Sequence, residues 1–428
     1  MCSYIISPPP GTLDIFDDEM NRRRMIKNVI DNTLPLYGYK EIETPIIEYS
    51  EVFKRNIGYQ NDVVNKEMYI FKDRGGRELA LRPEATAGTI RALIKANFLD
   101  DPKMNHVYYY GPMFRSDRPA AGRRKQFNQV GVENVCDPNP FQDAECIIML
   151  THLLNNLQIT NGTLLINTKG SDKDMMVTVE AMKKFFSNYI GEMCSDCKDR
   201  LQNNVLRILD CKVKRCKTII TQSPKIIDLI CNKSQKYFNE VINILDNNKI
   251  KYNISHQLIR GLDYYKHTIF EVQHDISGKI DAITGGGRYI ISMKGLEKNI
   301  NGVGFASGIE RFILAQDSCK VQINNKQQKL VYIITPPNCS EETKKNNFIL
   351  MQTLRKNNIF VTMNFDDTKS TKSQMRLANR CNASHIMIIG DNERKSKIIG
   401  IKDMATGEQK NIDQVEIVDY IKNKLILS

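Results

Sequence analysis

A helical, lysine-rich segment at 170–248 divides a chain whose flanking parts carry strand-type sequence. Apolar runs of strand length stand on both sides of it, at 107–115, 126–133, 163–168, 256–265, 268–272 and 302–311. The basic connector between the first two runs suggests a hairpin that reaches an anion. This order favours one antiparallel β-rich domain that is interrupted by a helical unit.

A polar segment at 322–329 separates this domain from a tail with a different pattern. In the tail, strand-type runs at 330–335, 359–363 and 385–390 alternate with helical patterns around 346–356 and 373–381. Strands that alternate with helices favour a small α/β domain with a partly parallel sheet. We therefore predict an α+β chain with a principal domain at 1–168 and 249–325, a helical insertion at 169–248, and a C-terminal α/β domain at 326–428.

Length and charge set the broad class. The chain has 428 residues and a formal net charge of +12, which allows two or three compact domains and makes a polyanion a plausible partner. It has no run of about 18 apolar residues, so we expect no membrane span. The first ten residues lack the pattern of a secretory signal, so we expect a cytoplasmic protein.

Several familiar sites are absent from the sequence. It contains no P-loop string, no H-E-x-x-H string and no nucleophile elbow, and the glycines at 302, 304 and 308 have the wrong spacing for a dinucleotide fingerprint. What remains is a set of arginines on predicted strands or strand ends: Arg82, Arg115, Arg123, Arg260 and Arg311. A nucleotide pocket and scattered ion pairs are both open explanations, and the glycines and carboxylates beside these arginines favour the pocket.

Ordered strings of the chain carry a family resemblance. The helix and strand that end at Pro45, the run from Phe114-Arg115 to Gln129, and the run 304–311 resemble motifs 1, 2 and 3 of class II aminoacyl-tRNA synthetases. The strings 81–88 and 258–265, with 285–289, narrow the resemblance to histidyl-tRNA synthetases. The resemblance covers almost the whole chain, including 407–409.

The resemblance implies a fold, a reaction and partners. It implies a class II antiparallel catalytic domain, a helical insertion that grips the tRNA acceptor stem, and a C-terminal anticodon-binding domain. The implied reaction joins histidine to its tRNA through a histidyl-adenylate, with ATP as substrate, together with magnesium. Such enzymes act by positioning and charge neutralisation and need no protein nucleophile. Motif 1 implies a homodimer.

The resemblance also assigns roles to single residues. Arg115, Arg260 and Arg311 would be catalytic, with Arg115 and Arg260 on opposite sides of the α-phosphate. ATP would also contact Asp117, Arg123 and Phe127. Histidine would be bound by Glu84, Thr86, Arg115, Gln129, Glu133, Arg260, Tyr264 and Tyr265. From its own sequence context, Glu133 has a second interpretation, as a structural partner of an arginine.

Three positions depart from the family pattern: Asp117 replaces the usual Glu, Ala120 a common Gln, and Ile290 a common Asp. The Asp117 side chain is one methylene shorter, so we expect a weaker adenine contact, together with altered acceptor-end reading at Ala120 and altered loop packing at Ile290. A different class of function is therefore kept as an alternative, namely a catalytically silent paralogue that acts as a histidine-sensing regulatory subunit or an RNA-binding protein. The anticodon-like tail and the intact arginine set favour the enzyme.

The insertion also contains a cysteine pattern. Cys194 and Cys197 are separated by two residues, and Cys211 and Cys216 by four. This spacing suits four thiolate ligands around zinc, and Cys231 adds a fifth cysteine nearby. We favour reduced structural thiols, with zinc as the less favoured alternative.

Overall fold

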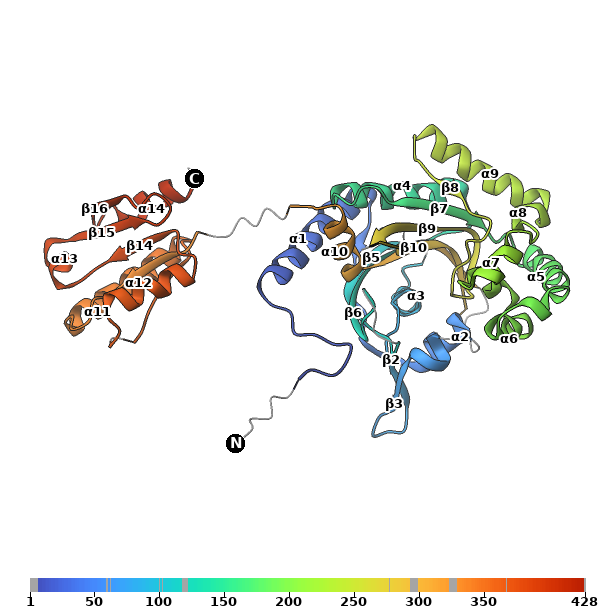
Figure 1. Ribbon diagram of the computed structural model, residues 1–428, viewed down its shortest axis with the longest axis horizontal. Coiled ribbons are helices and arrows are strands. Elements are labelled where there is room, and N and C mark those ends of the chain that lie inside the picture. The colour runs from blue at the N-terminus through green and yellow to red at the C-terminus, as the bar shows by residue number, and fades with distance from the viewer. Residues whose placement is uncertain are drawn as a thin grey trace. The chain divides into compact units, whose positions relative to one another are not determined.

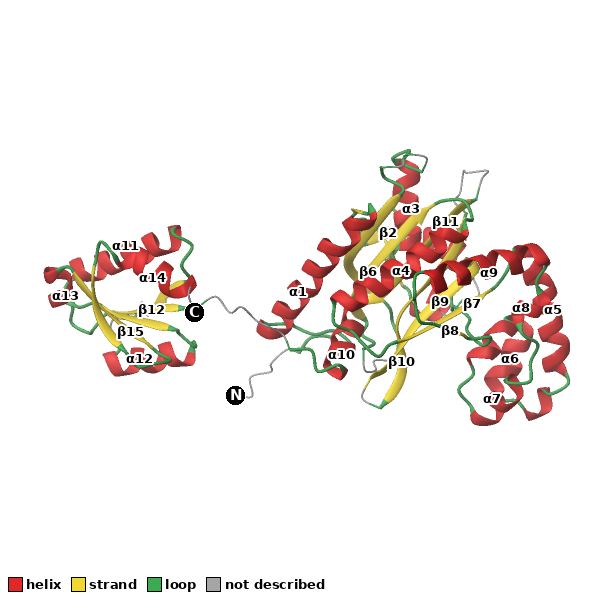
Figure 2. Ribbon diagram, turned by 90° about the horizontal axis from the view of Figure 1, so that it is seen from above, coloured by secondary structure: helices red, strands yellow, loops and turns green. Residues whose placement is uncertain are grey.

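The computed structural model describes residues 7–58, 61, 63–99, 101, 103–117, 122–276, 278–292, 299–322, 329–366 and 368–426. The chain divides into two compact units, Met1–Ile323 and Asn324–Ser428 (Figures 1 and 2). The boundary between the two units falls within the polar segment 322–329 that the sequence marks as a linker.

Within the described residues, the first unit is built on an eight-stranded sheet with the order β1-β5-β6-β11-β10-β9-β7-β8. Its strands are β1 (Lys40–Glu41), β5 (His106–Phe114), β6 (Gln126–Val135), β7 (Thr163–Thr168), β8 (Asn253–Ile254), β9 (Tyr265–Ile276), β10 (Lys279–Ile291) and β11 (Ile300–Gly308). The pairs from β5 to β7 are antiparallel, and only the two edge pairs are parallel. Strands from both sides of the helical segment share this sheet, which confirms the predicted fold class.

One face of the sheet packs against helices α1 (Asp17–Thr33), α4 (Pro140–Asn156), α9 (Asn232–Asn247) and α10 (Ile309–Ser318) (Figure 1). Val130 and Val132 of β6 point into this core with Val303 and Phe305 of β11. Because side chains alternate along a strand, the residues between them face the other way. The alternation along β6 therefore places Val130 and Val132 in the core, and Phe127, Gln129 and Glu133 on the opposite face.

A buried ion pair fixes the sheet to these helices. Arg288 of β10 and Asp143 of α4 are both fully buried, and an oxygen of Asp143 lies 2.6 Å from Nη2 of Arg288. Arg288 also donates to the carbonyl of Cys136 at 3.0 Å, and the hydroxyl of Tyr237 on α9 donates to Asp143 at 2.9 Å. This network joins three elements that lie far apart in the sequence.

The opposite face carries a smaller three-stranded sheet, β2-β4-β3, and two helices. These are β2 (Ile47–Tyr49), β3 (Tyr69–Lys72), β4 (Glu78–Leu81), α2 (Ser50–Ile57) and α3 (Thr86–Lys95), and the short turns η1 (Leu34–Tyr37) and η2 (Val63–Glu67) precede β1 and β3. The small residues at 85–88 suggest a turn in the sequence, but they start a helix, because α3 begins at Thr86. The carboxylate of Glu84 accepts from the amides of Thr86 at 2.7 Å and Ala87 at 3.1 Å, which starts the helix.

Two other local predictions are corrected. The predicted strand at 41–48 is broken into β1 and β2 around Pro45, which has no amide proton for a strand ladder. The segment 256–265 is a loop up to Tyr264, and its end alone begins β9. Its apolar residues are buried in two cores, Leu258 beside α2 and α3 and Ile259 in the core of the insertion, so they reflect burial and not strand pairing.

The inserted segment contains α5 (Asp172–Ser187), η3 (Ile190–Glu192), α6 (Ser195–Asn203), η4 (Val205–Asp210), α7 (Lys214–Ile220) and α8 (Ile226–Leu229), which share their own apolar core. Helix α9 does not pack in this core along its whole length, because its Val241 and Leu245 belong to the core of the main sheet. One carboxylate joins the two ends of the small helical core. Asp174 accepts from the amides of Ser171 at 2.8 Å and Cys231 at 2.7 Å, and from the hydroxyl of Ser234 at 2.5 Å.

Within its described residues, the second unit has a five-stranded sheet with the order β13-β12-β14-β15-β16. Its elements are β12 (Val331–Ile334), α11 (Glu341–Lys356), β13 (Val361–Met363), α12 (Thr371–Arg380), β14 (His385–Ile388), α13 (Asp391–Ser396), β15 (Ile398–Asp403), β16 (Gln409–Asp413) and α14 (Ile417–Ile426). Strands β13, β12 and β14 are parallel, and the last two pairs are antiparallel. This confirms the predicted α/β tail with a partly parallel sheet.

None of the helices in the described part of the chain combines the length and the apolar character that crossing a membrane would require.

The buried ion pair gives a stability prediction. Asp143→Ala leaves the guanidinium of Arg288 buried without its counter-charge, so we expect a loss of about 3–5 kcal/mol in the unfolding free energy of the first unit. Urea unfolding followed by circular dichroism measures it. The control is Glu41→Gln, which removes the half-exposed partner of Lys27 and should cost less than about 1 kcal/mol. Equal losses in the two variants would contradict the central role of the buried pair.

Candidate active site

A cavity of about 420 Å³ lies over the sheet face that the helices of the main core leave open. Its walls come from β6, β10, β11 and α10, and from the loops that follow β5 and precede β9. Seven of the predicted site residues line it: Arg115, Asp117, Arg123, Phe127, Gln129, Arg260 and Arg311. Residues that are scattered along the sequence thus meet in one place.

Strand β6 carries a row of site residues along this face. Phe127, Gln129 and Glu133 alternate with core residues and so point to the same side of the sheet. Phe127 is half-buried, whereas Gln129 and Glu133 are buried. Six residues of strand span about 20 Å. The row therefore runs from an open, aromatic end to a closed, acidic end, which suits an elongated ligand.

Glycines leave space on this face of the sheet for the side chains of the site. A Cβ atom at Gly285 would lie 2.3 Å from the guanidinium carbon of Arg260, and one at Gly304 would lie 2.7 Å from Oε2 of Glu133. Both contacts are shorter than real Cβ atoms tolerate. The side chains of Arg260 and Glu133 can lie against the strands only because these positions have no side chain.

Two arginines approach the cavity from opposite sides. Arg115 follows β5, and Arg260 lies over β10. Since β6 and β11 separate these strands, three strand spacings of about 14 Å in total lie between them. Nε of Arg115 donates to the carbonyl of Pro83 at 2.8 Å, and its guanidinium lies 5.5 Å from the ring centre of Phe127. Arg260 forms a short ion pair with Glu271 of β9.

Two more arginines of the cavity, Arg311 and Arg123, form ion pairs with aspartates. Arg311 lies 3.0 Å from Asp281 and donates to the carbonyl of Ala282 at 2.9 Å. Arg123 lies 3.5 Å from Asp117, and both of these side chains are largely open to solvent. Arg311 and its neighbour Glu310 belong to helix α10, not to the strand run in which the sequence pattern placed them. The helix turns Arg311 back over the sheet.

The closed end of the row contains two buried carboxyl groups, Glu84 and Glu133. Burial raises the pKa of both groups, and that of Glu133 reaches about 8, with a further contribution from the nearby charge of Glu84. Glu133 therefore holds a proton at neutral pH. The raised pKa argues against the interpretation of Glu133 as an ordinary partner of an arginine, which would lower it.

Three further predicted residues surround these carboxyls. Thr86, Tyr264 and Tyr265 are buried, and the two tyrosine rings lie 4.8 Å apart. Glu84 is fixed by the two amides at the start of α3, which sets its direction. Buried groups that donate and accept hydrogen bonds can recognise a small ring with one nitrogen of each kind.

One arginine of the sequence set is not in the cavity lining. Nε and Nη1 of Arg82 donate to the carbonyls of Pro112 at 2.9 Å and Thr44 at 2.8 Å, so this buried side chain ties β4 to the neighbouring backbone. In this case the ordinary structural explanation holds, and the nucleotide-pocket interpretation of Arg82 is wrong.

Glu271 and Arg207 are two of the polar residues of the site that the sequence missed. Glu271, the partner of Arg260, gives no signal until β9 is known to lie beside Gly285 of β10. Arg207 of η4 also lines the cavity, and its Nη1 lies 3.4 Å from the carbonyl of Gly261. The only signal for Arg207 is a charge within the apolar string 205–209.

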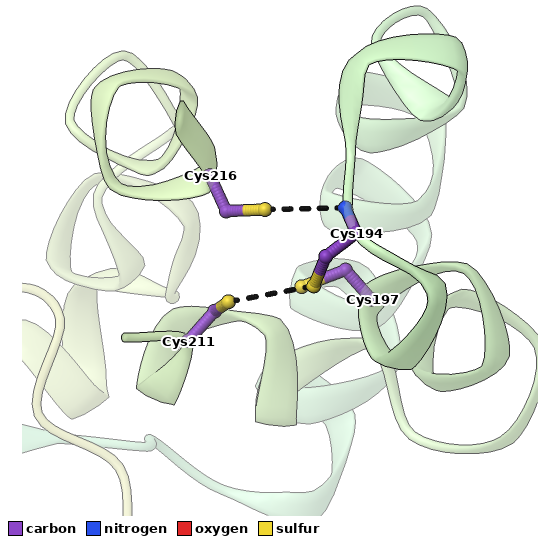
Figure 3. Close-up of side chains that lie close together, drawn as sticks. All are labelled: Cys194, Cys197, Cys211 and Cys216. Carbon is purple, nitrogen blue, oxygen red and sulfur yellow. Dashed lines mark hydrogen bonds between the residues drawn. The ribbon is translucent and has the colours of Figure 1, made fainter. Parts of the chain in front are cut away.

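Two of the positions that depart from the family pattern, Asp117 and Ile290, lie in different parts of the structure. Asp117 pairs with Arg123 at the open end. Ile290 is half-buried in β10, and its amide donates to the carbonyl of Tyr264 at 2.9 Å, so this position anchors the tyrosine loop through its backbone. Ala120 lies outside the described residues. The four cysteines of the predicted zinc alternative come together in the insertion, outside this cavity (Figure 3).

Comparison with known proteins identifies the family. The model of "Histidyl-tRNA synthetase" matches residues 11–172, and the model of "Anticodon binding domain" matches 330–424. The histidine–tRNA ligase of Staphylococcus haemolyticus is 39% identical over 425 residues, which are 98% of this chain and 100% of that protein. That of Halothermothrix orenii is 39% identical over 418 residues, with 97% and 99% covered.

A solved structure agrees with these relatives. The apo histidyl-tRNA synthetase of Staphylococcus aureus superposes with a TM-score of 0.79 at 33% identity, over 97% of this chain and 99% of that one. The fold, the ordered motifs and the full-length similarity have one explanation: the chain belongs to the histidyl-tRNA synthetase family.

Proposed function

We propose that this protein is an enzyme that joins histidine to its tRNA in two steps, at the expense of ATP. The observation that carries the proposal is the row on β6, with arginines around its open end and two buried carboxyls at its closed end. An anionic nucleotide suits the first environment, and an imidazole suits the second. The similarity to histidine–tRNA ligases over the full length supports the same reaction.

In the first step, a carboxylate oxygen of histidine attacks the α-phosphorus of ATP and forms the adenylate, while the bond to pyrophosphate breaks. Arg115 and Arg260 would neutralise the charge that develops on the phosphoryl oxygens from opposite sides. Their anchors on Pro83 and Glu271 support this role, because anchored donors need no reorganisation during the reaction. Arg311 would hold the outer phosphates.

The remaining contacts to ATP lie at the open end. Phe127 would stack on the adenine, and Asp117 would accept from its amino group, with Arg123 on the phosphates. Carboxylate oxygens are the ligands that Mg²⁺ takes, and the lining includes those of Glu67 and Asp281. The cleft therefore fits ATP in its magnesium complex, in which the metal offsets phosphate charge.

Histidine would occupy the closed end. Glu84, Thr86 and Gln129 would bind its α-amino group, and Glu133 and Tyr265 its imidazole, with Tyr264 along the pocket wall. An unpaired acceptor on Gln129 supports a polar ligand here, since its Oε1 is buried without a partner. An amino acid without a matching ring would leave these groups unsatisfied.

In the second step, a hydroxyl of the terminal ribose of tRNA attacks the activated carbonyl, and AMP leaves. We propose that the C-terminal unit reads the anticodon, which its match to an anticodon-binding model supports. Of the basic residues there, Arg394 is 2.7 Å from Glu342, so the exposed Arg376, Arg380, Lys395 and Lys397 are better placed to meet phosphates.

We also propose a homodimer that works in the cytoplasm. In the segment that resembles motif 1 and the adjoining hairpin, Ile47, Tyr49 and Phe71 are exposed, and the strand register places all three on one face of the three-stranded sheet. Exposed apolar side chains gathered in one region mark a docking surface. The free thiols of the ten described cysteines support a reducing compartment.

The defining test is exchange of labelled pyrophosphate into ATP. Reversible adenylate formation predicts exchange that depends on added histidine and saturates with it. A histidine-sensing regulatory subunit or an RNA-binding paralogue would bind its ligand without this exchange. Exchange that is absent, or that is indifferent to histidine, would rule out the enzyme.

Arg260→Ala should reduce the rate of histidine-dependent exchange about 100- to 1,000-fold, because one preorganised donor to the developing charge is lost. Equilibrium binding of histidine, measured by calorimetry, should change much less. Arg74→Ala is the control, since Arg74 is exposed in the turn between β3 and β4 and does not line the cavity. A parallel loss of histidine binding in Arg260→Ala would argue against a role in the chemical step.

Glu133 gives a test of protonation. With a pKa of about 8, its neutral carboxyl meets the ligand at neutral pH, and a neutral amide should replace it. We expect the KM for histidine to rise less than about tenfold in Glu133→Gln and about 10- to 100-fold in Glu133→Ala, which loses the hydrogen bond. The KM for ATP is the internal control. If the histidine KM rose by the same large factor in both variants, a charged carboxylate would be required.

A further inference from the structure

The helical insertion brings four cysteine side chains together at one point (Figure 3). Cys194 precedes α6, Cys197 lies in its first turn, Cys211 follows η4, and Cys216 lies in α7. The four sulfur atoms all lie within 4.8 Å of one another. Two cysteines, Cys194 and Cys197, precede the 13 residues 198–210, and the other two, Cys211 and Cys216, follow them.

The spacing of the sulfurs fits a tetrahedral metal site. Zinc–thiolate bonds of about 2.3 Å place the corners of a regular tetrahedron about 3.8 Å apart. Sγ of Cys194 lies 3.7 Å from Sγ of Cys211. A disulfide needs about 2.05 Å between its sulfurs, so this pair is spaced for joint coordination and not for a bond to each other.

The backbone around the cluster is also arranged for charged sulfur. The amide of Cys194 points at Sγ of Cys216, with 3.3 Å between nitrogen and sulfur (Figure 3). An amide donor stabilises a thiolate more than a thiol, because the thiolate carries the negative charge. Cys197, Cys211 and Cys216 are buried among apolar residues, where thiolates are stable only beside a cation.

Basic residues around the cluster complete the charge balance. Three of the four residues between Cys211 and Cys216 are basic, Lys212, Lys214 and Arg215, and all three are exposed. Four thiolates and one divalent cation leave two negative charges, which such neighbours offset. Soft sulfur ligands select zinc over magnesium or calcium, which prefer oxygen.

We propose that Cys194, Cys197, Cys211 and Cys216 bind one structural Zn²⁺ ion. Four protein ligands close the coordination sphere and leave no position for a substrate, so the ion is structural and not catalytic. The elements that it joins are short: α6 has 9 residues, η4 has 6 and α7 has 7. Helices of this length are marginal by themselves, and a metal cross-link stabilises a small core.

Two successive hydrogen bonds connect helix α6, which carries Cys197, to the loop of Arg260. Nη1 of Arg200 on α6 donates to the carbonyl of Arg207 on η4 at 3.1 Å, and Arg207 in turn reaches the carbonyl of Gly261, next to Arg260. The metal would fix the hairpin of α6 and η4 that carries this contact. Zinc loss is therefore expected to lower the melting temperature and also to slow adenylate formation.

Metal analysis of the full chain tests the proposal. Protein purified with reductant and without chelator, then incubated with ZnCl₂ and desalted, should contain about one zinc per chain by atomic emission. Cys197→Ser and Cys211→Ser should lose most of it. The matched control is Cys231→Ser, which changes an exposed cysteine of the same segment and should keep the full content. Less than about 0.2 zinc per chain in the unaltered protein would overturn the proposal.

Cobalt tests the geometry without a substitution, in case the serine variants fail to fold. Unaltered protein stripped of metal under reducing conditions and given CoCl₂ should develop the strong visible absorption of tetrahedral cobalt–thiolate coordination. Zinc should then abolish that absorption at one equivalent per chain. A weak octahedral spectrum, or peptide mapping that finds Cys194 joined to Cys211 in freshly prepared protein, would overturn the proposal.

Discussion

The site depends on a sheet face from which side chains are absent at a few positions. Gly285 leaves the space that the guanidinium of Arg260 occupies, and Gly304 leaves the space beside the carboxyl of Glu133. An added methyl group would meet the guanidinium of Arg260 at Gly285, and at Gly304 it would meet the carbonyl of Val132 and the carboxyl of Glu133. The opposite face of the same strands is filled with Val303 and Phe305, so the sheet can be open on one side because the other side supplies its stability.

The sequence predicted much of this arrangement, but not all of it. The strands from β5 to β7 and the tail could be predicted, because their apolar periodicity records which face is buried. Arg115 and Arg311 could be assigned because their motifs resemble a family. The loop before β9 was predicted as a strand, since its Leu258 and Ile259 are buried in two cores, and periodicity does not distinguish burial in a loop from burial in a sheet. Arg82 was misassigned because sequence does not show which backbone carbonyls lie nearby.

Contacts between distant segments were beyond the reach of sequence. Gly261 receives Arg207 from the insertion, and its carbonyl also accepts from Asn61. Glu271 contacts Arg260 only because β9 and β10 pair in one register. The same limit applied to the cysteines: their spacing allowed zinc and reduced thiols alike, and the distances between the sulfur atoms favour the metal. In each case the deciding fact is a distance, which a linear pattern does not contain.

The carboxylate of Asp174 has a consequence for how such a protein is assembled from parts. It holds the entrance of the small helical core, at Ser171, against the exit, at Cys231 and Ser234. The two ends of this segment lie next to each other in space, because both contact Asp174. If the segment were removed, a short turn would be enough to join the flanking residues. A chain that lacked this module could still connect β7 to α9, but it would lose Arg207 from the cavity lining.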